Sequence, residues 1–397
     1  MTFRNRPLVR LGAAALLASG ALTVLGTPAH AAGATDLSLD VVGTRLAAGV
    51  EGKVAFAKIT NRGDATPGSL TVGIDVSKVD FDKVAALPLA DKCDVEGEGR
   101  PVRWTCDIPG ADLPGPGETI DVPVVIFRNV EIKGSYGAPV TVTIESPDDT
   151  DESNNSTSAT VELTGVNGPD LLVLAEDVKR GITIADDGAT VHDDLKAGQY
   201  AELLYTAFNQ GDQTSVGLRS TVKLPEGVTF TTPMDGCDFA EDQTSVVCTW
   251  DDLVMIPTQD DTNGEDDAFS GVEVSMLVRV AKDVKPGALG GSVAVASLGV
   301  QQTRPKITKA QLPEQVRGVQ AEDVDASDNT DAFAFIVVDG SNGGGGGGDG
   351  GLPVTGPQAT LIGGLGATVI AAGAAMFLVT RRRRVVLVTP GDEKTIT

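Results

Sequence analysis

The sequence predicts an all-β fold, and three observations lead to this prediction. Apolar and polar residues alternate along Val272–Val280, and again along Val140–Ile144 and Ala159–Leu163. A period of two places one face of a strand against a core. Turn pairs such as Asn-Gly, Pro-Gly and Gly-Asp separate these runs, and no convincing amphipathic helix occurs between residues 33 and 340. Many short strands at this spacing are typical of Greek-key or immunoglobulin-like β-sandwiches.

An internal duplication predicts two such sandwiches in tandem. Asn-Arg-Gly-Asp-Ala-Thr at Asn61–Thr66 returns as Asn-Gln-Gly-Asp-Gln-Thr at Asn209–Thr214. A pair of cysteines follows in each copy, and the Asp/Asn-rich run at Asp149–Ser156 returns at Asp323–Thr330. Because the landmarks keep their order, we expect one domain at residues 33–165 and a second at 170–339, joined by a linker at 166–169. The second copy is longer, and its extra length falls in two polar insertions, Pro257–Gly271 and Gln301–Glu322.

The N-terminus has the pattern of a cleaved signal peptide at residues 1–32. Three arginines precede an uncharged stretch at residues 11–26, and Ala29 and Ala31 form an A-x-A cleavage site. An uncleaved membrane anchor is the alternative, but 16 apolar residues are short for a span. We therefore expect export.

Four cysteines in an exported chain indicate two disulfides. Three connectivities are possible, and the repeat favours the local pairs because each pair sits at the same place in its copy: Cys93–Cys106 and Cys237–Cys248.

The acidic charge and the scarcity of histidine limit the possible functions. A formal net charge of −24 disfavours nucleic acid and anionic lipid as partners and favours solubility or cation binding. His192 is the one histidine outside the signal peptide, which argues against a Ser-His-Asp triad, a catalytic thiol and a zinc site. Carboxylate pairs for glycoside hydrolysis are possible, but no pair stands out.

The C-terminus combines four features in a fixed order. A Gly-rich spacer at residues 340–351 precedes a pentapeptide, an apolar span at 358–380 predicted as a transmembrane helix, and a tail at 381–397. The charge-free part, Ala359–Val379, would form a helix of about 31 Å, long enough for a hydrocarbon core of about 30 Å. The arginines after it should stay cytoplasmic and stop transfer. The pentapeptide is Leu352, Pro353, Val354, Thr355 and Gly356, and the arginines are Arg381, Arg382, Arg383 and Arg384.

This order resembles the LPxTG sorting signal of Gram-positive cell-wall surface proteins. The resemblance implies that a sortase cleaves between Thr355 and Gly356 and links Thr355 to peptidoglycan, after a membrane-spanning precursor stage. A plain membrane-anchored protein with a coincidental LPVTG is the alternative.

The repeats also resemble the conserved-repeat and cell-adhesion-related immunoglobulin-like modules of bacterial surface proteins. The residues that carry this resemblance are Asn-x-Gly-Asp, Leu-Pro-x-Gly-Val at Leu224–Val228, the paired cysteines and the closing Asp/Asn run. It implies a fold and leaves the surface ligand unknown.

Two Asp/Asn clusters are candidate calcium sites. Calcium takes 6–8 oxygen ligands from flexible loops. Asx turns, in which the side-chain oxygens accept backbone amides, explain the same pattern. The candidate ligands are Asp149, Asp151, Asn154 and Asn155 in the first copy, and Asp323, Asp325, Asp328 and Asn329 in the second.

Arg62-Gly63-Asp64 has the sequence of an integrin-binding tripeptide. Because the second copy has Gln210 at the place of Arg62, we interpret Asn-x-Gly-Asp as a turn, with glycine at a position of positive φ.

We thus expect a non-enzymatic protein of the cell wall with an adhesive, ligand-presenting or structural role. A wall-attached polysaccharide-processing enzyme and a pilus-type subunit are the alternatives.

Overall fold

A computed structural model describes residues 33–89, 93–130, 134–184, 190–261, 269–301 and 323–339. The signal peptide, the spacer, the sorting motif, the apolar span and the arginine cluster lie outside these residues, as do parts of both polar insertions. Among the residues described, no helix is long and apolar enough to cross a membrane.

The described chain is all-β, as the sequence predicts. Its helices are three short 3-10 turns, namely η1 (Gly110–Asp112), η2 (Glu152–Asn154) and η3 (Thr258–Asp260). The alternating run at Val272–Val280 forms one strand, β19, in which Val274, Met276, Val278 and Val280 are buried and their polar neighbours face outwards. The strand pattern follows from burial on one face only.

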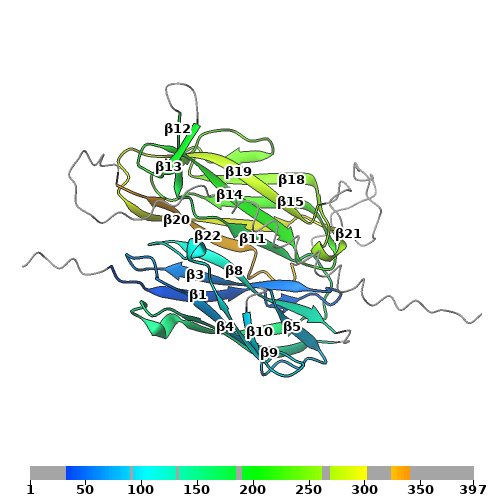
Figure 1. Ribbon diagram of the computed structural model, residues 1–397. Coiled ribbons are helices and arrows are strands. Elements are labelled where there is room, and N and C mark those ends of the chain that lie inside the picture. The colour runs from blue at the N-terminus through cyan, green and yellow to red at the C-terminus, as the bar shows by residue number, and fades with distance from the viewer. Residues whose placement is uncertain are drawn as a thin grey trace, which may run out of the picture. The chain divides into compact units, whose positions relative to one another are not determined.

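The first half of the chain forms two sheets (Figure 1). One has the order β1-β3-β8-β5, with β1 Leu37–Val42, β3 Lys53–Asn61, β8 Thr119–Asn129 and β5 Val84–Pro88. The other has the order β2-β10-β9-β4-β7-β6, with β2 Arg45–Leu46, β10 Ser156–Leu163, β9 Tyr136–Glu145, β4 Thr71–Asp75, β7 Arg103–Asp107 and β6 Cys93–Glu96.

The second half also forms two sheets. One has the order β13-β12-β14-β19-β16 with β11 on β14; the bounds are β13 Thr190–Asp194, β12 Arg180–Ile184, β14 Tyr200–Asn209, β19 Gly271–Val280, β16 Val228–Phe230 and β11 Leu171–Ala175. The other has the order β17-β18-β15-β20-β22 with β21 on β15; the bounds are β17 Cys237–Phe239, β18 Ser245–Met255, β15 Thr214–Lys223, β20 Gly287–Ser297, β22 Thr330–Val337 and β21 Val300–Gln301.

The strand orders match from half to half. The order β1-β3-β8-β5 corresponds to β11-β14-β19-β16, and β10-β9-β4-β7-β6 corresponds to β22-β20-β15-β18-β17. The register agrees as well, because Leu37 pairs with Asn61 and Leu171 pairs with Asn209. The duplication in the sequence is therefore a duplication of the fold, and the β12–β13 hairpin is an addition of the second half.

Each half has its own hydrophobic core between its two sheets. Valine, leucine, isoleucine and alanine dominate both cores, and Trp104 is the largest fully buried side chain. A third, small cluster joins the halves: Val42 and Phe56 of the first pack with Leu172 of the second. Val324 of the second half is buried in the core of the first. The two halves thus share apolar contacts as well as a linker.

Candidate functional site

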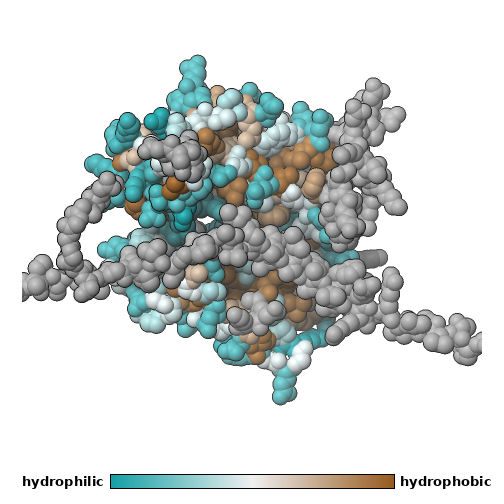
Figure 2. All heavy atoms as spheres, turned by 45° about the horizontal axis from the view of Figure 1, so that its top comes forward, coloured by the Kyte–Doolittle hydropathy of each residue, from teal (hydrophilic) through white to brown (hydrophobic). Residues whose placement is uncertain are grey.

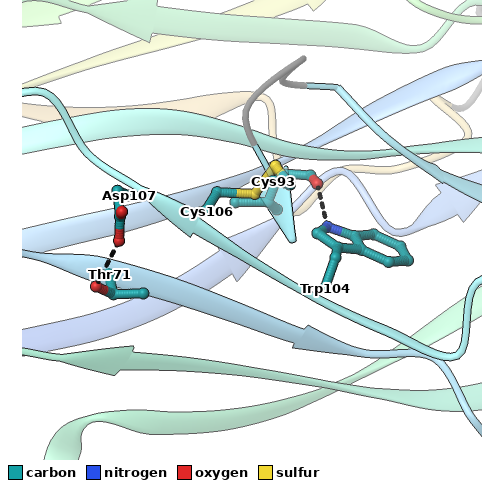
Figure 3. Close-up of a disulfide and its surroundings, with 6 residues drawn as sticks. Thr71, Cys93, Trp104, Cys106 and Asp107 are labelled. Atoms are coloured by element: carbon teal, nitrogen blue, oxygen red, sulfur yellow. Dashed lines mark hydrogen bonds between the residues drawn. A yellow bond between two sulfur atoms is a disulfide. The ribbon is translucent and has the colours of Figure 1, made fainter. Parts of the chain in front are cut away.

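Both predicted disulfides are present, and each joins directly opposed residues of neighbouring strands. Cys93 pairs with Cys106 across β6 and β7, and Cys237 pairs with Cys248 across β17 and β18. Figure 3 shows the first disulfide near Trp104, whose indole N–H donates to the carbonyl of Val124 at 3.3 Å. The disulfides tie the outermost strands β6 and β17 to their sheets, which is a structural role.

The Asn-x-Gly-Asp segments form turns in both halves. Asn61 Oδ1 accepts from Gly63 N, and Asn209 Oδ1 accepts from Gly211 N. Asp64 Oδ1 accepts from Ala34 N, so this carboxylate ties the turn to the segment before β1. The turn interpretation of Arg62-Gly63-Asp64 therefore agrees with the structure.

The predicted reason for the glycine in this turn is wrong. Neither Gly63 nor Gly211 has a positive φ. A Cβ at Gly63 would lie 2.2 Å from the carbonyl oxygen of Ala34, and one at Gly211 would lie 2.3 Å from that of Gly168. Glycine is required because another backbone segment passes too close for any side chain.

The first Asp/Asn cluster is a hydrogen-bonded turn. Asp149 Oδ1 accepts from the amides of Leu37 and Asp151, and its Oδ2 accepts from Asn155 Nδ2 at 2.7 Å. Asp151 caps η2 by accepting from Ser153 N. These bonds are what the Asx-turn alternative predicts.

The second cluster repeats this framework. Asp323 accepts from the amides of Leu171 and Asp325, as Asp149 does from their counterparts. Asp325 accepts from Ser327 N and Ser327 Oγ. From these shared bonds and the spacing along the chain, the counterpart of Asp149 is Asp323 and that of Asp151 is Asp325. In the same way, Asn154 corresponds to Asp328 and Asn155 to Asn329.

One pair of side chains differs between the two turns. In the first half Asn154 Nδ2 donates to Asp36 Oδ1 at 3.2 Å. The counterparts in the second half are Asp328 and Asp170, two carboxylates that cannot donate to each other when ionised. Both are buried, whereas Asp36 is partly exposed. When both are ionised they repel each other, and a positive charge between them offsets this repulsion.

Lys53 of the first half supplies a positive charge. Its Nζ lies 2.7 Å from Asp170 Oδ2 and 3.1 Å from Asp325 Oδ2, with hydrogen bonds to both. It also lies 2.8 Å from Asp328 Oδ2, in an ion pair without hydrogen-bond geometry. All four side chains are fully buried. We call Lys53, Asp170, Asp323, Asp325 and Asp328 the junction cluster, since it lies where the two halves meet.

The titration of the junction cluster reflects its excess of carboxylates. Burial opposes the charge of Lys53, but the three neighbouring aspartates outweigh it and raise the pKa of the ammonium. Burial raises the pKa of Asp170 to about 7, with Lys53 offsetting only part of the effect, and raises that of Asp328 well above its usual range. Burial also acts to raise the pKa of Asp325, but the charge of Lys53 and the hydrogen bonds to this carboxylate hold its pKa below the ordinary value. One ammonium cannot neutralise this many carboxylates.

Further polar contacts join the halves around the junction cluster. Lys58 Nζ lies 2.8 Å from Asp121 Oδ1 and 2.5 Å from Asp331 Oδ1. The side-chain amide of Gln210 accepts from Val54 N and donates to Val54 O, and so extends the edge of β3. Unlike the apolar contacts, these hydrogen bonds and ion pairs depend on direction, so they restrict how the two halves pack against each other.

Sequence reasoning missed Lys53 and Asp170. It named Asp323, Asp325, Asp328 and Asn329 as oxygen donors, and the structure brings the first three together with Lys53. Comparing the two Asp/Asn-rich runs does indicate the site, because the second run has Asp328 where the first has Asn154. The other indication is a lysine at position 53, beside the apolar stretch Val54–Ala57.

A hollow on the second half carries several acidic side chains. Its lining includes Met234 and Trp250 together with Asp235, Asp251 and Glu273. Hydrophilic and apolar residues are interspersed on the face drawn in Figure 2. Asp251 lies on β18 and Glu273 on β19, so both sheets of the second half contribute carboxylates to this hollow.

The fold and these sites define a disulfide-bonded all-β protein with a duplicated two-sheet unit. No family model matches the sequence, and no curated protein matches it. Among solved structures, red sea bream transglutaminase is similar over 77% of this chain, with 11% identity and a TM-score of 0.23, and the chain spans 32% of its length. A B domain of a biofilm-associated protein is similar over 65% of this chain and 81% of its own, with 9% identity and a TM-score of 0.21. At such scores neither likeness carries an argument about function.

Proposed function

We propose that this chain is an exported surface protein that a sortase links to peptidoglycan through Thr355. The observation that carries the proposal is the order of the C-terminal features: spacer, Leu352–Gly356, apolar span and arginine cluster. The signal-peptide pattern at the other end supports it. The two disulfides support it as well, because such bonds persist in oxidising compartments outside the cell.

In this proposal the two halves are immunoglobulin-like domains with a non-enzymatic role in adhesion, ligand presentation or surface structure. The duplicated strand order supports tandem domains of one type. The junction cluster and the shared apolar contacts support a stiff pair of domains at the end of the spacer, rather than two domains on a loose linker. A stiff pair holds a binding surface at a fixed distance from its attachment point.

The test of anchoring is mass spectrometry of wall material released by muramidase. We expect a peptide that ends at Thr355 and is amide-linked to a wall fragment. Thr355→Ala should move the protein from the wall to the membrane and the medium. Val354→Ala is the matched control, since the sorting pattern leaves that position free. A mature protein that retains Arg381–Arg384 would overturn the proposal.

The acidic hollow near Trp250 favours the wall-attached enzyme as the second candidate. That function predicts hydrolysis of a wall or capsule polysaccharide that is lost in a variant carrying Asp251→Asn and Glu273→Gln. Unchanged polysaccharide after incubation with the unmodified protein would exclude it.

A further inference from the structure

The junction cluster contains more negative charge than its one lysine can balance. Three aspartates, at positions 170, 325 and 328, contact a single ammonium, and a fourth, Asp323, lies beside Asp170 and Asp328. Placing ionised carboxylates in a protein interior is costly unless each is paired or binds a metal. Lys53 uses one oxygen of each carboxylate it contacts, always the Oδ2 atom.

The second oxygens of two of these carboxylates have no partner. Asp170 Oδ1 and Asp328 Oδ1 are buried and accept no hydrogen bond, and the two residues are 0% and 1% exposed. Buried acceptors are almost always satisfied in proteins, so such a pair indicates a missing ligand. Asn329 Oδ1, next in the chain to Asp328, is also buried without a partner, but so is Asn155 Oδ1 at the counterpart position of the first half. The two carboxylate oxygens, and not this amide oxygen, therefore distinguish the second half.

Three carboxylates of the junction cluster lie close enough together to share one cation. Asp170, Asp323 and Asp328 each offer an oxygen, and the three oxygens lie within 4.8 Å of one another. Carboxylate and amide oxygens are the ligands that Ca²⁺ takes, in a geometry that tolerates irregular spacing. Asp323 and Asn329 are only partly buried, which leaves a route from solvent to the cluster.

We propose that a hard divalent cation, for which Ca²⁺ is the probe, binds Asp170, Asp323 and Asp328, with Asn329 Oδ1 as a further ligand. Lys53 stays on the Oδ2 atoms that it already contacts, and the cation takes the oxygens that it leaves free. Asp170 precedes the first strand of the second half, and the other three ligands precede its last strand, while Lys53 comes from the first half. The cation therefore clamps the two ends of the second half beneath the contact with the first.

The first half gives the reason why only one such site forms. There Asn154 stands at the place of Asp328 and donates a hydrogen bond to Asp36 Oδ1. An amide donor replaces the cation. The two halves therefore compensate the corresponding carboxylates, Asp36 and Asp170, in different ways. The first half uses a hydrogen bond from Asn154, and in our proposal the second uses Lys53 and a metal cation beside Asp328.

The test compares Asp328→Asn with the unmodified full-length protein. The variant should fold, because the Asp36–Asn154 pair shows that this turn accepts an asparagine. Calorimetric titration with CaCl₂ should show one bound ion per chain for the unmodified protein. Calcium should also raise its Tm by several degrees relative to chelator. The variant should bind at least tenfold more weakly and should show no shift in Tm.

Asp36→Asn is the matched control, because it changes the counterpart of Asp170 in the half that has no proposed site. It should keep both the calcium binding and the shift in Tm. Absence of binding to the unmodified protein would overturn the proposal. So would an equal response of the Asp328→Asn variant, since calcium would then bind elsewhere on the acidic surface.

Discussion

Lys53 Nζ lies 2.7 Å from Asp170 Oδ2 with both side chains fully buried, although 117 residues separate them in the chain. The lysine begins β3 in the first half, and the aspartate immediately precedes β11 in the second. The contact therefore connects two sheets that share no strand. We expect the charges to favour this relative arrangement of the halves, because an arrangement that buried one ion without its partner would be costly.

Replacing Lys53 by methionine should destabilise the protein strongly. The side chain keeps a similar volume, but Asp170, Asp325 and Asp328 lose their shared cation. Removing one partner of a buried ion pair costs about 3–5 kcal/mol. Urea denaturation in the presence of chelator measures the loss.

Lys179→Met is the matched control for that experiment. Lys179 pairs with Glu118, but its side chain is 51% exposed. Exposed ion pairs contribute about 0–1 kcal/mol. Losses of equal size in the two variants would contradict the role assigned to Lys53.

The sequence suffices to predict the strands, the duplication and the disulfides, because these depend on local patterns. A period of two identifies β19 from the chain itself, and the repeated position of the cysteines identifies their pairing. Cys93 and Cys106 lie directly opposite each other on the antiparallel strands β6 and β7. A short connection between two such strands brings residues near in sequence to opposed positions, which is why this pairing can be predicted locally.

The junction cluster depends on tertiary structure and could not be predicted in the same way. Lys53 and Asp325 are 272 residues apart. The apolar stretch Val54–Ala57 beside Lys53 indicates a buried strand, but it does not show which partners the lysine meets. Only the packing of one half against the other turns it into a buried cation. The need for glycine at Gly63 is likewise tertiary, because the obstructing carbonyl belongs to Ala34.

Each disulfide should stabilise its own half independently. The closed loops span 13 residues for Cys93–Cys106 and 11 for Cys237–Cys248. In the chain-entropy model each closure contributes roughly 3 kcal/mol. We expect paired Cys→Ala variants to lose about that amount each. Because the bonds lie in different cores, the losses should add in the quadruple variant, as measured by urea denaturation. A strongly non-additive result would contradict separate cores.

Asp177 should make stability depend on pH. Burial raises its pKa to about 6, although the amides of Thr119 and Ala334 donate to it. The neighbouring charges are Glu118, which raises the pKa further, and Lys179, which lowers it. Because the folded-state pKa lies above that of the unfolded chain, this group stabilises the fold below about pH 4. The contribution is lost as the pH rises to about 6.

The measurement for Asp177 is the free energy of unfolding between pH 4 and pH 7. The Asp177→Asn variant should lack this component, on the order of 2 kcal/mol, so its stability should fall less across that range than that of the unmodified protein. Comparing the two proteins cancels the contributions of the other shifted carboxylates. Parallel pH profiles would show that Asp177 titrates alike in the folded and unfolded states.

Gly211→Ala should destabilise the second half through backbone crowding. The new Cβ would lie 2.3 Å from the carbonyl oxygen of Gly168 and 2.7 Å from Asp170 N, and both are backbone atoms that cannot rotate away. Relief requires the segment before β11 to shift, and that segment carries Asp170 into the junction cluster. We expect the free energy of unfolding to fall by about 1–3 kcal/mol, which is typical of overpacking.

Gly110→Ala is the control, since its Cβ would meet nothing within 4 Å and its φ is not positive. Its effect on the free energy of unfolding should stay within about 0.5 kcal/mol. If calcium binding is also measured, Gly211→Ala should weaken it, because the same shift displaces Asp170. A Gly211→Ala variant as stable as Gly110→Ala would show that the segment before β11 yields freely and does not hold Asp170 in place.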